Sequence, residues 1–79
     1  MLIQIQYFAQ LRGLGGPDSI ELDDGTTVSG LLKRLFQEAP GLEPWKKHLL
    51  VAAGTDWVPQ DHVIKAGDII SLMPPVQGG

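Results

Sequence analysis

The most informative segment of this chain is "TTVSGLLKRLFQEAPG", residues 26–41. Thr26 or Thr27 can cap the start of a helix, although neither has the Glu or Gln of a capping box three residues later. Pro40-Gly41 ends the pattern. Apolar side chains recur between these limits at the three- and four-residue spacing of one helix face, and they are Val28, Leu31, Leu32, Leu35, Phe36 and Ala39. The segment therefore predicts one long amphipathic helix that needs an apolar layer to cover.

Two strands are predicted before the helix. Residues 2–8 alternate in polarity, with Ile3, Ile5 and Tyr7 on one face, and Gln4, Gln6 and Phe8 on the other. We expect the first face to be buried and the glutamines to lie in solvent. A loop rich in Gly and Pro, residues 13–17, separates this strand from a shorter one in residues 18–23.

The segments after the helix predict the rest of the sheet. "LLVAA", residues 49–53, is typical of a buried strand, and a short strand is expected at residues 57–58. "DHVI", residues 61–64, suggests a single helical turn or a loop. The last strand is expected at residues 69–73, with Ile70 and Leu72 sharing one face. The order ββαββ predicts an α+β fold in which the helix covers one face of a small mixed sheet.

Composition limits the classes of function. The 79 residues form one small domain, and a net charge of −3 argues against nucleic acid as a partner. We expect no membrane association and a cytoplasmic location, because neither a signal peptide nor a long apolar stretch is visible. Without cysteine there is no thiolate nucleophile, and His48 and His62 lack the spacing of metal ligands. "GLGGPD", residues 13–18, has Asp18 where a nucleotide-binding loop needs glycine. We therefore expect neither a bound metal nor a catalytic cluster.

The end of the chain, "PPVQGG", residues 74–79, carries the expected chemistry. Pro74 and Pro75 stop the last strand and favour an extended path. Gly78 and Gly79 lack side chains, so the backbone can enter a narrow channel and present its carboxyl group. A carboxylate becomes reactive only after activation, for example as an acyl-adenylate made with ATP. We therefore divide the chain into a domain, residues 1–74, and a flexible Gly-Gly tail, residues 75–79.

Two segments, "YFAQLRGLGG" (residues 7–16) and "KAGDIISLMPPVQGG" (residues 65–79), together with the helix between them, resemble the small sulfur-carrier subunits of molybdopterin synthase. These belong to the ubiquitin-like β-grasp group, which also contains the thiazole-forming sulfur carriers. The resemblance covers essentially the whole chain, and the "PPVxGG" ending is specific to the molybdopterin branch. It implies a β-grasp fold in the domain.

The resemblance also implies a mode of action. An ATP-dependent activating enzyme adenylates Gly79, and sulfur is then installed to give a C-terminal thiocarboxylate. The tail enters the large synthase subunit and donates sulfur to a cyclic pyranopterin precursor of the molybdenum cofactor. The chain is then a non-catalytic subunit of a heterotetramer, without a bound cofactor, and Gly78 and Gly79 are its reactive end.

Three positions depart from the family pattern. Gln77 replaces a more usual Ser or Thr, Gly13 a common Glu, and Gly54 a frequent Asn. Three alternative functions stay open: sulfur carriage for thiazole synthesis or another pathway, a ubiquitin-like protein modifier, and a binding module with an incidental Gly-Gly ending.

Strand parity nominates a partner surface. Phe8 and Met73 are expected on neighbouring strands, on the sheet face away from the helix, where exposed apolar side chains suggest a contact site. Trp57 extends this surface, and Arg12 is expected to pair with a partner carboxylate. The alternative is that Phe8 and Trp57 cover the edge or core of the sheet. The remaining predicted contacts lie in the tail, at Pro75, Val76 and Gln77.

Overall fold

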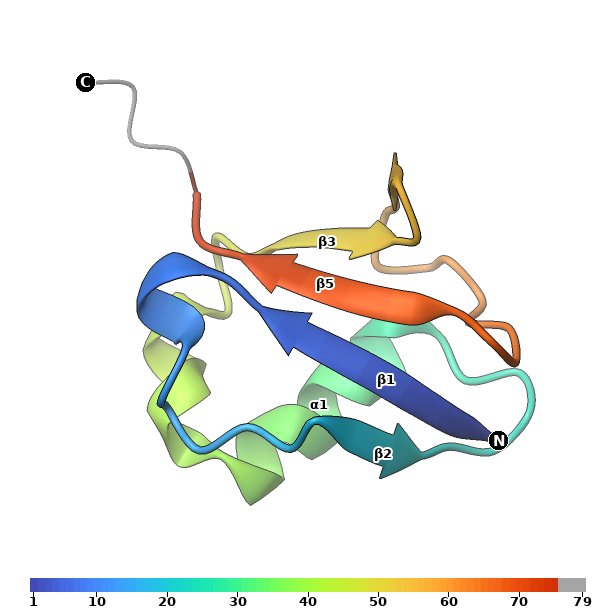
Figure 1. Cartoon of the computed structure of the whole chain (residues 1–79), viewed down its shortest axis with the longest axis horizontal. Helices are drawn as coiled ribbons and strands as arrows, with labels where there is room; N and C mark the ends of the chain where they lie inside the picture. Colours follow the sequence, from blue (N-terminus) through green and yellow to red (C-terminus); the bar gives the residue numbers. More distant parts are fainter. Residues whose placement is uncertain (76–79) are drawn as a thin grey trace.

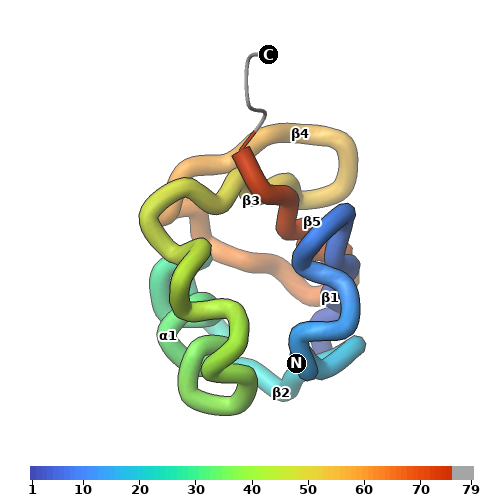
Figure 2. Tube along the Cα trace, turned by 90° about the vertical axis from the view of Figure 1, so that its left-hand side faces the viewer, coloured from blue at the N-terminus to red at the C-terminus, as the bar shows by residue number. Residues whose placement is uncertain are grey.

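A five-stranded mixed sheet with one long helix on one face makes up the computed structural model, which describes residues 1–75 (Figures 1 and 2). The strands lie in the order β2-β1-β5-β3-β4; β1 and β5 are parallel and the other pairs antiparallel. Their bounds are Leu2–Tyr7 for β1, Ser19–Glu21 for β2, Leu50–Ala53 for β3, Asp56–Trp57 for β4 and Ile69–Met73 for β5. The α+β arrangement is confirmed, and counting the short β4 extends the expected order to ββαβββ.

The predicted helix is α1, Val28–Glu38. Thr27 is its N-cap, since the Thr27 hydroxyl accepts a hydrogen bond of 3.2 Å from the Gly30 amide. A Cβ atom at Gly30 would lie 3.2 Å from the Thr26 methyl group, so this glycine allows a tight first turn. After Pro40 the chain forms a 3-10 helix, η2 (Pro40–Trp45), where the sequence indicated only a loop.

The core lies between α1 and the inner face of the sheet. The predicted inner residues of β1 and β5 are buried, and they are Ile3, Ile5, Ile70 and Leu72. The helix contributes Val28, Leu31, Leu32 and Leu35 to the same cluster. Phe36 packs only at the margin of this core and is half-buried. Parity therefore assigned the two sheet faces correctly.

Two local expectations need correction, and the choice left open for residues 61–64 is decided in favour of a loop. The first strand ends at Tyr7, because Phe8 begins a 3-10 helix, η1 (Ala9–Leu11), that the sequence did not reveal. The segment 61–64 is a turn and loop, connected to the start of α1 by an isolated bridge between Thr27 and Val63. The strand 49–53 is not buried throughout, because Leu50 faces solvent.

Figure 1 places η1 and the end of β1 beside the end of β5. The Phe8 amide donates a hydrogen bond of 3.1 Å to the Leu72 carbonyl there. β5 ends at Met73, directly before Pro74, as the missing amide donor of proline predicts. No helix within residues 1–75 has the length and apolar character to span a bilayer.

Candidate functional site

The register of the strands brings polar and apolar side chains into rows across the outer face of the sheet, the face away from α1. Gln6 pairs with Ser71, Ser71 with Ala52, and Ala52 with Trp57. In the next row Met73 pairs with Leu50. Successive residues of a strand alternate in direction, so these partners share the face opposite the core.

We call four apolar side chains at the outer face the outer patch: Phe8, Leu50, Trp57 and Met73. Trp57 is 61% exposed and Leu50 37%, whereas Phe8 and Met73 are half-buried. Trp57 therefore does not belong to the core; it lies on the edge strand β4, so the alternative that it covers the edge of the sheet stays open. Leu50 was missed at the sequence level; the signal was its antiparallel pairing with Met73, which only the register reveals.

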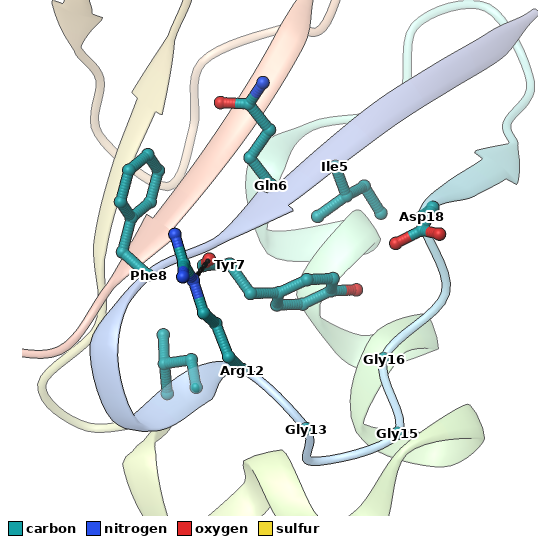
Figure 3. A pocket seen from close by; sticks show the side chains of 10 residues that line it. Ile5, Gln6, Tyr7, Phe8, Arg12, Gly13, Gly15, Gly16 and Asp18 are labelled. Carbon is teal, nitrogen blue, oxygen red and sulfur yellow. Dashed lines mark hydrogen bonds between the residues drawn. The ribbon is translucent and has the colours of Figure 1, made fainter.

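Arg12 lies beside the outer patch, at the mouth of an open groove of about 740 Å³ between β1 and the loop that leads to β2 (Figure 3). Its Nε atom donates a hydrogen bond of 3.3 Å to the Tyr7 carbonyl. Its side chain is exposed, and within residues 1–75 no carboxylate lies within ion-pair distance of it. The structure thus leaves the positive charge of Arg12 without a counter-charge in the described domain.

The side chain of Tyr7 lines the same groove. Figure 3 shows its ring directed to the opposite side of β1 from Gln6 and Phe8. Its hydroxyl donates a hydrogen bond of 2.7 Å to the Pro17 carbonyl. Burial, with a smaller contribution from the negative charge of Asp18, raises the pKa of Tyr7 from 10.0 to about 12. Sequence reasoning assigned Tyr7 to the buried face but gave no role to its hydroxyl.

Some of the predicted tail residues belong to the described part of the chain, and the others do not. Pro74 and Pro75 are half-buried and follow β5 directly. Val76, Gln77, Gly78 and Gly79 lie outside the described residues, so their expected roles stay predictions. The described part shows that the chain reaches them from the end of the sheet that carries Phe8 and Met73 (Figure 1).

Comparison with known proteins identifies relatives along the whole chain. The model of the ThiS family matches residues 5–79. The molybdopterin synthase sulfur carrier subunit of Haemophilus influenzae is 37% identical over 81 residues, covering 99% of this chain and 100% of the relative. The names of further relatives, from Chlamydomonas reinhardtii and Escherichia coli, are the same.

Solved structures agree on the fold. SAMP1, the small archaeal modifier protein 1 of Haloferax volcanii, superimposes with a TM-score of 0.85 at 26% identity, with both chains fully covered. A chain of the complex of subunits 1 and 2 of the molybdopterin-converting factor from Helicobacter pylori gives 0.68 at 25% identity, again with full coverage. These neighbours confirm the expected ubiquitin-like β-grasp architecture. Because the family model matches residues 5–79 and the relatives match essentially the whole chain, the chain belongs to the ThiS family.

Proposed function

We propose that this chain is the sulfur carrier and small subunit of a molybdopterin synthase, with Gly79 as the residue that carries the sulfur. The observation that carries the proposal is the end-to-end match to a relative named molybdopterin synthase sulfur carrier subunit, at 37% identity. The terminal Gly-Gly supports it, because an unhindered carboxyl group is what such a carrier modifies.

The proposed chemistry takes place on the terminal carboxylate. One carboxylate oxygen attacks the α-phosphorus of ATP on an activating enzyme, and pyrophosphate leaves. A sulfur nucleophile at the oxidation level of sulfide then attacks the acyl carbon. The bond between this carbon and the phosphate oxygen breaks, and AMP leaves with the electron pair of that bond. The product is a thiocarboxylate on Gly79. Its sulfur displaces an oxygen substituent from a carbon of a cyclic pyranopterin precursor, and water then cleaves the resulting thioester, which leaves the sulfur on the precursor and restores the Gly79 carboxylate. The chain supplies no catalytic side chain of its own in this scheme, and it needs no bound cofactor.

The outer patch is the proposed contact with the large synthase subunit. The complex of subunits 1 and 2 from Helicobacter pylori supports a partner of this kind. Leu50 is exposed on β3, next to the strand that leads to the tail, and Trp57 is exposed on β4, one strand further away. A carrier must dock reversibly near its reactive end, and exposed apolar side chains suit such a contact. Arg12 lies at the rim of the patch, where it can pair with a carboxylate of the partner.

The test is the intact mass of the protein after incubation with ATP, a sulfur source and an activating enzyme of the family. We expect a gain equal to the exchange of one oxygen for sulfur, and no gain for a variant that lacks Gly79. The Haemophilus influenzae relative serves as the positive control. If that relative is modified and this chain is not, the proposal is wrong.

A second candidate, a ubiquitin-like protein modifier, is favoured by one observation, the similarity to SAMP1. Both functions begin with adenylation of the terminal carboxyl group, and they differ in the acceptor. A modifier leaves covalent conjugates of higher mass in cells, whereas a carrier transfers sulfur to a small molecule. Transfer to a thiazole precursor instead of the pyranopterin precursor would place the carrier in the thiazole branch.

A further inference from the structure

The loop between η1 and β2, residues 12–17, is held at its far end by the side chain of Tyr7. The Tyr7 hydroxyl donates a hydrogen bond of 2.7 Å to the Pro17 carbonyl. A Cβ atom at Gly16 would lie 2.4 Å from both Cζ and Oη of Tyr7, closer than real contacts allow. Only glycine therefore lets the ring pack directly on the loop backbone at this position.

The near end of the same loop is held by the main chain of the same residue. The Tyr7 carbonyl accepts a hydrogen bond of 3.3 Å from Arg12 Nε (Figure 3). The turn of η1 sets the position of the Arg12 backbone, since its amide donates 3.1 Å to the Ala9 carbonyl. Tyr7 thus fixes the loop at both ends, through its carbonyl at one and its hydroxyl at the other.

In the middle of the loop, Leu14 packs against the core beside Gly41, but the glycines on either side of it have no side chain that could hold them. Gly13 and Gly15 have φ values of +77° and +89°, and a Cβ atom at either would meet nothing within 4 Å. Glycines in this region of φ lose much conformational freedom when they are ordered. The conformation of the loop therefore depends on the two ends that Tyr7 holds, together with the packing of Leu14.

The orientation of the Arg12 guanidinium follows from this arrangement. Its Nε atom is used by the Tyr7 carbonyl, which leaves the two terminal nitrogens for an external acceptor. A guanidinium whose plane is fixed matches the two oxygens of a carboxylate with little further ordering. Within residues 1–75 no carboxylate of this chain uses it.

We propose that Tyr7 is a positioning residue: its hydroxyl bond to Pro17 and its packing on Gly16 hold the loop so that Arg12 presents its guanidinium to a carboxylate of the large subunit. The inference rests on the proposed function and adds a residue that acts through Arg12 without touching the partner. Binding is favoured because the loop is already ordered in the free carrier.

The experiment measures the Kd for the large subunit of the same species by isothermal titration calorimetry. We expect Tyr7→Phe, which removes one hydroxyl and keeps the ring, to bind about fivefold more weakly, the effect of one lost hydrogen bond. In an Arg12→Ala background the same change is expected to have no further effect, because Tyr7 acts through Arg12.

Thr26→Val is the matched control, because the Thr26 hydroxyl also donates 2.7 Å to a backbone carbonyl, that of Asp23, outside the loop. We expect this variant to lower the stability comparably and to leave the Kd unchanged. Hydrogen exchange provides a second readout: the amides of residues 13–16 should exchange faster in Tyr7→Phe and at the original rate in Thr26→Val.

The outcomes separate the two proposals. If the wild-type chain binds tightly and the Kd of Tyr7→Phe is unchanged, the positioning role is overturned and the proposed function is not. A fivefold loss that persists in the Arg12→Ala background also overturns it, because Tyr7 then acts independently of Arg12. If the wild-type chain does not bind the large subunit, both the proposed function and the positioning role are overturned.

Discussion

Replacing Trp57 with alanine tests whether the outer patch is the docking surface. The side chain is 61% exposed on β4, the short edge strand of the sheet. A tryptophan presents up to ~250 Å², so ~150 Å² is available to a partner. At ~25 cal/mol per Å², complete burial of that area would contribute ~4 kcal/mol.

The measurable loss is smaller than this upper limit. Ordering of side chains and imperfect fit reduce the binding free energy that each Å² of buried area contributes. Truncation of a central aromatic residue typically weakens the binding free energy by about 2 kcal/mol. We therefore expect Trp57→Ala to raise the Kd for the large subunit about 30-fold. The free energy of unfolding should change by less than ~0.5 kcal/mol, because the side chain is mostly in solvent.

The assay is calorimetric titration with the large subunit, paired with thermal unfolding followed by circular dichroism. Val63→Ala is the control, because Val63 is 48% exposed but lies in the loop that bridges to Thr27 at the start of α1. An unchanged Kd for Trp57→Ala, or an equal loss for Val63→Ala, would refute the assignment of the patch. A large fall in the melting temperature of Trp57→Ala would instead show that the side chain supports the fold.

Three further predictions concern the reactive end, a titration and a cap. Deletion of Gly79 should abolish the gain in mass on sulfur loading and leave the melting temperature unchanged; a loaded variant would refute the role of this residue. Burial raises the pKa of Tyr7 from 10.0 to about 12, so the folded chain keeps a proton that the unfolded chain loses. The contribution of Tyr7 to stability is therefore constant below pH ~10 and falls between pH ~10 and ~12. Solvent exposure limits this loss to about 1 kcal/mol, and Tyr7→Phe should unfold in urea with a correspondingly weaker pH dependence in that window; an identical dependence would contradict the assigned cause. Thr27→Ala removes the N-cap of α1 and should cost about 1 kcal/mol in urea unfolding with no change in binding; unaltered stability would show that the cap contributes nothing.

Several elements of this protein were predictable because their signals are local. The helix from Val28 to Glu38 follows from apolar spacing and the threonine cap. The inner and outer faces of β1 and β5 follow from two-residue alternation, which any strand imposes on its side chains. The prolines after Met73 end the last strand because they lack the amide donor that the sheet requires.

Other elements escaped prediction because short helical turns have weak local signals. η1 begins immediately after an alternating strand, at Ala9, which has a φ of +54° that no sequence pattern requires of alanine. η2 contains Pro44 and follows Pro40-Gly41, a combination that indicates the end of a helix. In both places tertiary packing decided the conformation, since Leu11 and Leu42 are buried in the core.

The sequence by itself determined the helix, the faces of the strands, and the Gly-Gly ending on which the proposed carrier chemistry rests. Only the tertiary structure decided which residues of different strands meet. It placed Leu50 opposite Met73 and the ring of Tyr7 on the backbone of Gly16. The physical reason is that periodicity describes neighbours within one element, whereas register depends on how distant segments pack together. The outer patch follows from the register of the strands, and the support of the Arg12 loop follows from the packing of Tyr7 against it.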